Sequence, residues 1–171
     1  MNDRSQEIVI REDDFIVSKT DPKGKITYCN RIFIEIAGFS ESELLGQPHS
    51  IIRHPDMPRS VFRALWQTLQ AGREFFGIIK NRTKSGGFYW AFANVTPSLD
   101  AQGQLLGYFS VRRCPSRKGI DTLAPLYRQM VEEEARRDSA RNAMDASWDI
   151  LQQRLNQAGM NYEEFVLSLE Q

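Results

Sequence analysis

Hydrophobic residues in the first 115 positions alternate with polar ones in five short stretches, which is the period of β-strands. Turn sequences rich in glycine, proline, aspartate and serine flank these stretches. The pattern predicts strands over residues 15–20, 26–29, 75–82, 88–96 and 105–112. Short turns join the first two strands and the last three, so we expect hairpins on both sides of residues 30–70.

Residues 30–70 carry the start and stop signals of helices. They predict a helix from Asn30 to Gly38, another from Ser40 to Gly46, a single turn over 48–52 and a longer helix over 57–70. The longest helix has one apolar face with a tryptophan at its edge: Val61, Phe62, Leu65, Leu69 and Trp66. Hairpins around a helical segment are typical of an α+β fold, with short helices covering one face of a five-stranded antiparallel sheet. Short, irregular helices over such a sheet favour a ligand pocket.

The sequence changes character after Cys114. Residues 115–119 indicate a break, and residues 121–157 contain no glycine and a single proline, which predicts one long helix. Its apolar stripe is interrupted and includes Leu126, Met130, Met144, Trp148 and Leu151. Because a lone helix cannot bury such a stripe, we expect it to pair with its counterpart in a homodimer or with a partner helix. Folding back onto the open face of the sheet is the alternative. Asn161 and Glu164 predict a capping box for a last short helix.

Composition narrows the class of protein. The 171 residues are 41% hydrophobic and 26% charged, and fourteen of the eighteen aromatic residues lie within residues 15–115. The 22 basic and 22 acidic side chains balance, which argues against a general nucleic-acid binder. No apolar run approaches the length of a membrane span, and the N-terminus lacks the apolar region of a signal peptide. With only two cysteines, these features predict a cytoplasmic protein.

Motifs of common enzyme classes are absent from the sequence. There is no G-x-S-x-G nucleophile elbow, no phosphate-binding glycine loop and no zinc-binding C-x-x-C or H-E-x-x-H. His49 and His54 have no cysteine or carboxylate cluster around them, so we expect no metal site. The sequence predicts a protein that is not an enzyme.

Polar residues stand out at two places among the apolar elements. Arg53 and His54 lie just before the longest predicted helix, where an anion is favoured, and a surface Arg–Asp pair is the alternative. Asp56 is placed to be the N-cap of that helix. Asn81 ends the apolar strand face that also carries Phe75, Gly77 and Ile79, so its amide needs a backbone or ligand partner.

The next strand places small residues beside large aromatic ones. One face carries Tyr89, Ala91, Ala93 and Val95, and the other carries Phe88, Trp90, Phe92 and Asn94. Such a mixture leaves room for a flat ligand, and ordinary core packing is the alternative.

Together these segments resemble a PAS domain, and specifically the flavin-binding PAS domain of bacterial aerotaxis receptors. The resemblance is carried by Gly46–Pro58 (GQPHSIIRHPDMP), by the apolar helix face with Trp66, by Gly77–Gly86 (GIIKNRTKSG), and by Tyr89 and Trp90. It covers about residues 12–114 and implies a PAS fold with non-covalently bound FAD. It also implies redox or oxygen sensing, with a signal passed to a partner and no catalytic turnover. We divide the chain into an N-terminal cap segment (1–11), the PAS sensor domain (12–118) and a helical extension (119–171).

The resemblance also implies which residues lie near the cofactor. Carried over position by position, they are Asn30, Arg53, His54, Asp56, Trp66, Asn81, Tyr89 and Trp90. In this interpretation Asn81 bonds the edge of the flavin ring, Trp66 stacks on it, and Arg53 with His54 meets the pyrophosphate or holds the neighbouring helix. The alternative function is an apo PAS interaction module whose pocket is filled by its own side chains.

Overall fold

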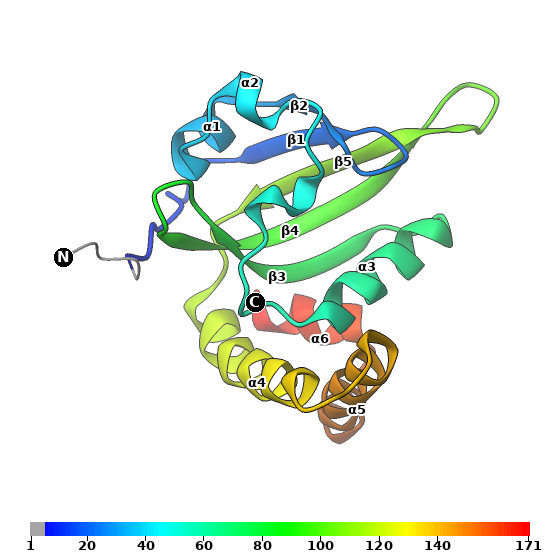
Figure 1. The fold of residues 1–171 in the computed structure, drawn as a ribbon. Helices are drawn as coiled ribbons and strands as arrows, with labels where there is room; N and C mark the ends of the chain where they lie inside the picture. The colour runs from blue at the N-terminus through cyan, green and yellow to red at the C-terminus, as the bar shows by residue number, and fades with distance from the viewer. Residues whose placement is uncertain (1–5) are drawn as a thin grey trace.

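Five antiparallel strands form one open sheet in the computed structural model, which describes residues 6–171 (Figure 1). The strands are β1 (Ile16–Thr20), β2 (Ile26–Cys29), β3 (Phe75–Arg82), β4 (Phe88–Leu99) and β5 (Leu105–Arg113). Their order across the sheet is β2-β1-β5-β4-β3. The hairpin of β1 and β2 therefore meets the meander of β3, β4 and β5 where β1 pairs with β5. This arrangement confirms the predicted α+β fold with one five-stranded antiparallel sheet.

Short helices cover the inner face of the sheet. They are α1 (Arg31–Ala37), α2 (Glu41–Leu44), the 3-10 turn η1 (His49–Ile52) and α3 (Arg59–Gln70). The predicted caps of α1 and α2 are present. The Asn30 side chain accepts a hydrogen bond from the backbone N–H of Phe33, and Ser40 forms a capping box with Glu43. Gly38 ends α1 in a left-handed conformation, with φ of 75°, which explains the stop.

The start of the longest helix differs from the prediction. α3 begins at Arg59 rather than at residue 57, and its N-cap is Pro58, which has no side-chain hydrogen bond to offer. Asp56 is therefore not the cap, and the prediction that it would be is wrong. The first N–H groups of α3 need another partner.

The predicted single C-terminal helix is two helices, and a third follows. These are α4 (Arg117–Ala135), α5 (Ala140–Ala158) and α6 (Tyr162–Leu169), and α6 has the expected capping box at Asn161 and Glu164. The chain turns at residues 136–139, where Ser139 caps α5 by accepting from the backbone N–H of Asn142. The prediction failed because neither glycine nor proline marks this turn. Among the described residues no helix is long and apolar enough to cross a membrane.

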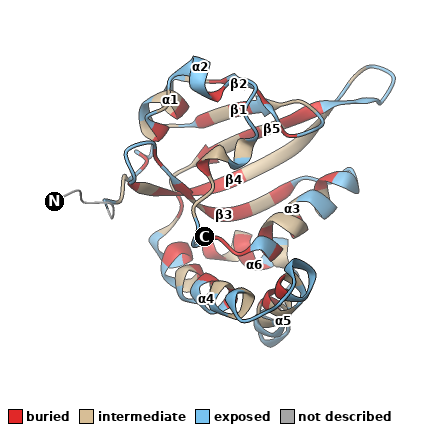
Figure 2. Ribbon diagram, viewed as in Figure 1, coloured by how far each residue is buried: buried red, intermediate tan, exposed pale blue. Residues whose placement is uncertain are grey.

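The helical extension folds back on its own domain. α4, α5 and α6 lie together below β3 and α3 in Figure 1, and in Figure 2 their buried residues face inward. Met130 and Leu151 are fully buried, in the same hydrophobic cluster as Ile78 of β3. The Tyr127 hydroxyl donates a hydrogen bond of 2.9 Å to the carbonyl of Ile78, and its ring stacks on Trp90. Much of the stripe expected to need a second chain is thus covered within this one.

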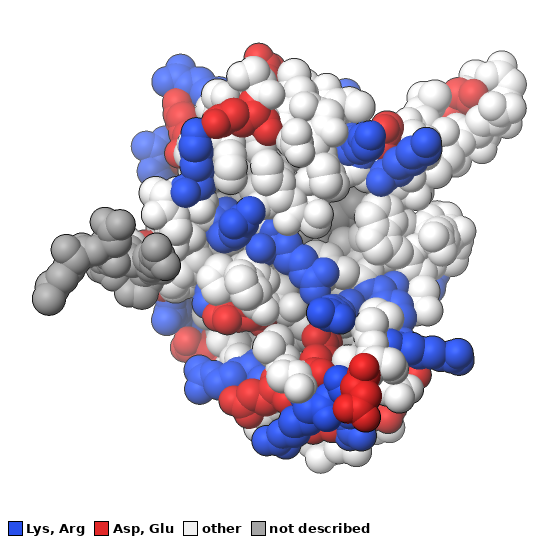
Figure 3. All heavy atoms as spheres, viewed as in Figure 1, with Lys and Arg blue, Asp and Glu red and all other residues white. Residues whose placement is uncertain are grey.

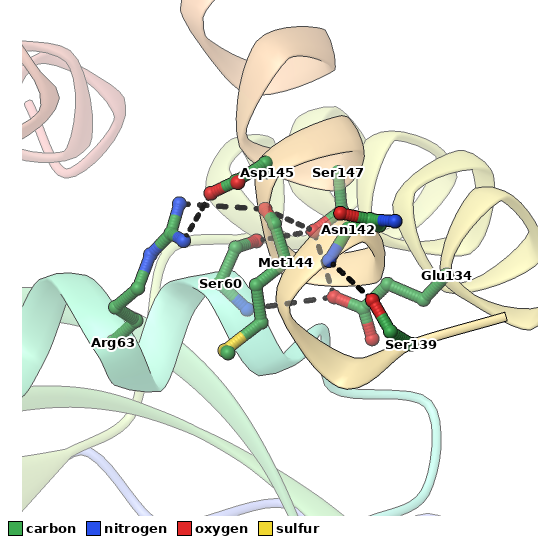
Figure 4. A network of polar contacts seen from close by, with 8 residues as sticks. All are labelled: Ser60, Arg63, Glu134, Ser139, Asn142, Met144, Asp145 and Ser147. Carbon is green, nitrogen blue, oxygen red and sulfur yellow. Dashed lines mark hydrogen bonds and ion pairs between the residues drawn. The ribbon is translucent and has the colours of Figure 1, made fainter. Parts of the chain in front are cut away.

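A network of polar contacts joins the extension to α3 (Figure 4). Glu134 Oε1 accepts from the backbone N–H groups of Arg59, at 2.8 Å, and Ser60, at 3.4 Å. The Ser147 hydroxyl lies 2.7 Å from Glu134 Oε1 and 2.7 Å from Ser60 Oγ, and both serines are fully buried. A carboxylate 75 positions away along the chain therefore caps the helix that has no side-chain cap of its own.

Candidate functional site

A cavity of about 320 Å³ lies between α3 and the inner face of the sheet. Its helical wall is the apolar face of α3 that the sequence predicted: Phe62, Leu65, Trp66 and Leu69. Trp66 is 38% exposed and meets the Tyr108 ring edge-on, with centroids 5.3 Å apart. Gly24 lies against the Trp66 ring, since a Cβ there would come within 3.3 Å of it. Trp66 is therefore a wall of the cavity close to its opening.

The sheet forms the floor of the cavity, and small residues keep it open. Ala93 of β4 lies in this floor and pairs with Gly77 of β3 and with Arg112 of β5. Asn81 lies at one end of the floor, and its residue is 4% exposed. The floor is thus mostly apolar, with an amide at one end.

A buried cation lies at the other side of the floor. Arg112 is 2% exposed and lines the cavity from β5. Its Nη2 donates to Ser18 Oγ at 2.7 Å, and its guanidinium carbon lies 4.6 Å from the centre of the Phe33 ring. Its Nε and Nη1 have no hydrogen-bond partner, and no described carboxylate pairs with it. Burial lowers the pKa of Arg112, but a guanidinium stays protonated in a protein, so the cavity holds an unpaired positive charge.

Ser18 links Arg112 to a histidine of the same cavity. Its hydroxyl lies 2.9 Å from His49 Nε2. Since Ser18 Oγ accepts from Arg112, its one proton is free to be donated to His49 Nε2, which requires that nitrogen to be unprotonated. Burial, and after it the charge of Arg112, lowers the pKa of His49 to about 3. His49 is therefore neutral, and Arg112 is the charged member of the group formed by Arg112, Ser18 and His49.

Three of the eight predicted site residues line the cavity: Arg53, Trp66 and Asn81. The Arg53 guanidinium lies 4.1 Å from the centre of the Phe62 ring, and its Nη2 donates to the carbonyl of Met57 at 3.3 Å. Burial lowers the pKa of Arg53. Arg53 thus borders the cavity and also holds the segment that leads into α3, while its contact with a pyrophosphate stays a prediction.

His54 and Asp56 do not line the cavity. His54 Nδ1 accepts from the backbone N–H of Asp56 at 3.1 Å. Asp56 is paired with Lys80 of β3, with 2.6 Å between carboxylate and ammonium. Burial alone would raise the pKa of Asp56. The hydrogen bond and the charge of Lys80 outweigh burial, so the pKa of Asp56 lies below its ordinary value. Both residues shape the loop that leads into α3.

Asn30, Tyr89 and Trp90 also lie outside the cavity lining. Asn30 joins β1 to α1, because its side chain donates to the carbonyl of Phe15 at 2.8 Å and accepts from the N–H of Val17 at 3.0 Å. Tyr89 is fully buried on the inner face, its hydroxyl has no hydrogen-bond partner in the described part of the chain, and burial raises its pKa to about 12. Trp90 lies on the outer face under α4. None of the three is part of the site proposed below.

Sequence reasoning missed Arg112, Ser18 and His49 as members of one group. The signal was present in β5, where Tyr108, Ser110 and Arg112 alternate and so share one face of the sheet. The inner face of the last strand therefore carried a cation that needed a partner.

Outside the cavity, Figure 3 shows further lysine and arginine side chains in a band across the middle of the molecule, over the segment from η1 to α3.

The model of the PAS fold family matches residues 9–115, which is the sheet with its short helices. The chain belongs to the PAS family. The matched segment ends just before α4, so the helical extension lies outside it.

Two curated relatives share this PAS domain. The aerotaxis receptor of Escherichia coli (strain K12) is 38% identical over 125 residues, which is 73% of this chain and 24% of the receptor. The nitrogen fixation regulatory protein of Klebsiella pneumoniae is 30% identical over 105 residues, which is 61% of this chain and 21% of that protein. The chain thus spans about a quarter or less of the length of these relatives.

A solved light-oxygen-voltage domain, studied with a flavin analogue, has a similar fold. Its TM-score is 0.57 at 20% sequence identity, over 65% of this chain and 83% of the other. The likeness at this identity concerns the fold alone. Family and relatives together show that this is a PAS sensor domain related to an aerotaxis receptor and to a nitrogen fixation regulatory protein.

Proposed function

We propose that this PAS domain binds a flavin, FAD, in the cavity over the sheet and senses redox state or oxygen through it. The observation that carries the proposal is the chemistry of the cavity: a mostly apolar space beside the sheet that contains an amide at Asn81 and a buried cation at Arg112 without a described counter-charge. A flavin ring is flat and apolar across its faces and has carbonyl and ring-nitrogen acceptors along one edge. The faces of a flavin ring would fill the apolar space, and its polar edge would accept hydrogen bonds from Arg112 and Asn81. The resemblance to aerotaxis receptors implies the same cofactor.

Each part of the cavity has a task in this proposal. Trp66 and Leu65 of α3 cover a face of the ring system, and Ala93 leaves the space that the ring fills. The Asn81 amide offers both a donor and an acceptor to the polar edge of the ring. Arg112 supplies donors whose burial makes an unpartnered state costly. The bound flavin supplies reversible two-electron chemistry, and the protein supplies its binding and surroundings.

The size of the cavity fits the ring rather than a whole dinucleotide. About 320 Å³ is at the lower end of ligand cavities, which span roughly 300–1,000 Å³. The exposed members of the lining mark the opening, and they include Lys23, Ser50 and Trp66. The phosphates and adenine of FAD would therefore lie along this opening, where Lys23 offers a positive charge.

The signal leaves the domain, in this proposal, through the helical extension. α3 carries the cavity wall at Trp66 and is capped by Glu134 of α4. Arg63 of α3 pairs with Asp145 of α5, with 2.6 Å between the charged atoms. A shift of α3 with the redox state of the flavin would strain these contacts and change how the extension docks onto the domain. A second copy of this chain, in a homodimer, or a signalling protein would respond to that change.

Flavin content after purification from flavin-replete cells tests the cavity assignment. We expect Trp66→Ala and Asn81→Ala to lower the flavin bound per chain at least tenfold in dilute solution, because each removes a direct contact. Tyr28→Ala is the matched control, since Tyr28 is an aromatic residue of similar exposure (45%, against 38% for Trp66) that lies outside the cavity. Equal flavin content in all three variants and the wild type would refute this assignment.

A further inference from the structure

Arg112 is a cation without an anion. It lies near the end of β5, the central strand of the sheet, where it pairs with Ile16 of β1 and Ala93 of β4, and 2% of its surface is exposed. A buried charge without a counter-charge is strongly disfavoured, and side chains in this position are normally paired. Among the described residues no aspartate or glutamate lies within ion-pair distance of it. A counter-charge for Arg112 must come from outside the described residues, and a ligand in the cavity that gains a negative charge can supply it.

The groups around Arg112 hold it in place and leave its charge uncompensated. Ser18 Oγ accepts from Nη2 at 2.7 Å, and the Phe33 ring covers the guanidinium at 4.6 Å. His49, bonded to Ser18, has a pKa of about 3 and is neutral. Tyr89 has a pKa of about 12 and is also neutral. Nε and Nη1 are the donors left over, and Arg112 is part of the cavity lining.

We propose that Arg112 pairs with a negative charge that the ligand gains on reduction, and that it thereby raises the reduction potential of the bound flavin. This inference rests on the proposed function. In the step concerned, an oxidised flavin takes two electrons from a soluble low-potential reductant and one proton at N5. N1 stays unprotonated, so one negative charge is spread over N1 and the neighbouring carbonyl.

The direction of the effect follows from differential binding. The oxidised ring is neutral and offers Arg112 only hydrogen-bond acceptors, whereas the reduced anion offers a full counter-charge. A group shifts an equilibrium only by the difference in its interaction with the two states. For a two-electron couple, each tenfold preference for the reduced form raises the potential by about 30 mV.

Two measurements on the full chain test this proposal. The first is the midpoint potential of bound flavin, by reductive titration with dithionite and a reference dye. We expect Arg112→Gln to lower it by at least about 30 mV, which is a tenfold loss of preference, and Arg112→Lys to keep most of the wild-type value. Arg113→Gln is the control, because the next residue lies on the outer face and pairs with Glu170. Its potential should equal that of the wild type.

The second measurement is the pH dependence of the potential between about pH 5 and 6.5. One proton taken up per two electrons gives a slope of about 30 mV per pH unit in the wild type, and two protons in Arg112→Gln give about 59 mV. His49, with its pKa of about 3, does not titrate in this window, and Lys23 and Arg53 are the other basic residues of the lining.

The outcomes are distinct. A wild-type slope of about 59 mV per pH unit overturns the proposal, and this result stands even where Arg112→Gln fails to fold or to retain flavin. An Arg112→Gln protein with the wild-type potential and slope overturns it as well, and leaves the flavin assignment intact. A wild-type protein that binds no flavin overturns the proposed function itself.

Discussion

Replacing Glu134 by alanine should weaken the joint between the helical extension and the sensor domain. The Glu134 carboxylate accepts three hydrogen bonds through one oxygen, from the N–H groups of Arg59 and Ser60 and from the Ser147 hydroxyl. Without it, the first turn of α3 loses its cap, and the buried Ser147 hydroxyl keeps only Ser60 Oγ and the Met144 carbonyl as partners among the described residues. The variant therefore affects both the joint between the two parts of the chain and the helix that forms the cavity wall.

The expected loss of stability follows from these contacts. Removing an N-cap costs about 0.5–2 kcal/mol, and a hydrogen bond to a charged group contributes about 1.5–3 kcal/mol. These values are not additive, and Glu134 is partly exposed, so water replaces part of what is lost. We expect a decrease of about 2 kcal/mol in the free energy of unfolding. For a chain of this length that is a fall of about 4–8 °C in the melting temperature.

Chemical denaturation of the variant and of a matched control measures this effect. Glu133→Ala is the control, because among residues 6–171 the neighbouring glutamate makes ion pairs only with Arg136 and Arg137, just past the end of its own helix. Such pairs contribute roughly 0.3–0.5 kcal/mol. Free energies of unfolding for the two variants that agree within about 0.5 kcal/mol would refute the role of Glu134 as the cap of α3.

Three further predictions concern single side chains. Tyr127→Phe should lower the free energy of unfolding by about 1–3 kcal/mol, because it leaves a carbonyl of the edge strand β3 without its partner; an unchanged denaturation midpoint would contradict this. The pKa of His49 is about 3 in the folded chain and near 6.5 when unfolded, so the unfolded state binds more protons between these values and stability should fall as the pH drops from about 6.5 towards 3. His49→Gln should flatten that dependence in pH-dependent unfolding experiments, and an identical slope would show that other groups cause it. Arg53→Ala should weaken flavin binding in equilibrium titrations more than His54→Ala, since only Arg53 lines the cavity, and equal losses would indicate a general role of their loop.

Local sequence signals predicted the sheet domain almost completely. Strand alternation, the caps at Asn30 and Ser40, and the apolar face of α3 each depend on residues close together in the sequence. The turn between α4 and α5 was missed because it has no glycine or proline, and the residues that hold it, such as Glu134, find their partners on α3. A contact between residues so far apart leaves no local signal.

In the candidate site, too, local sequence signals were found and features that depend on distant contacts were missed. Trp66 and Asn81 were found because each is unusual within its own element, a large aromatic at a helix edge and an amide on an apolar strand face. Trp90 was carried over with them by the motif, although its alternation with Tyr89 places it on the opposite face of the sheet. Arg112 stayed hidden because its role depends on the absence of a carboxylate nearby, which only the folded chain can show.

The absorption spectrum of the purified wild-type chain, before and after addition of a reductant, tests the central claim most directly. We predict a yellow protein whose flavin bands bleach on reduction and return on exposure to air, with one FAD released per chain on denaturation. A colourless protein from flavin-replete cells that also fails to take up added FAD, FMN or riboflavin would contradict the proposed function and favour an apo PAS interaction module.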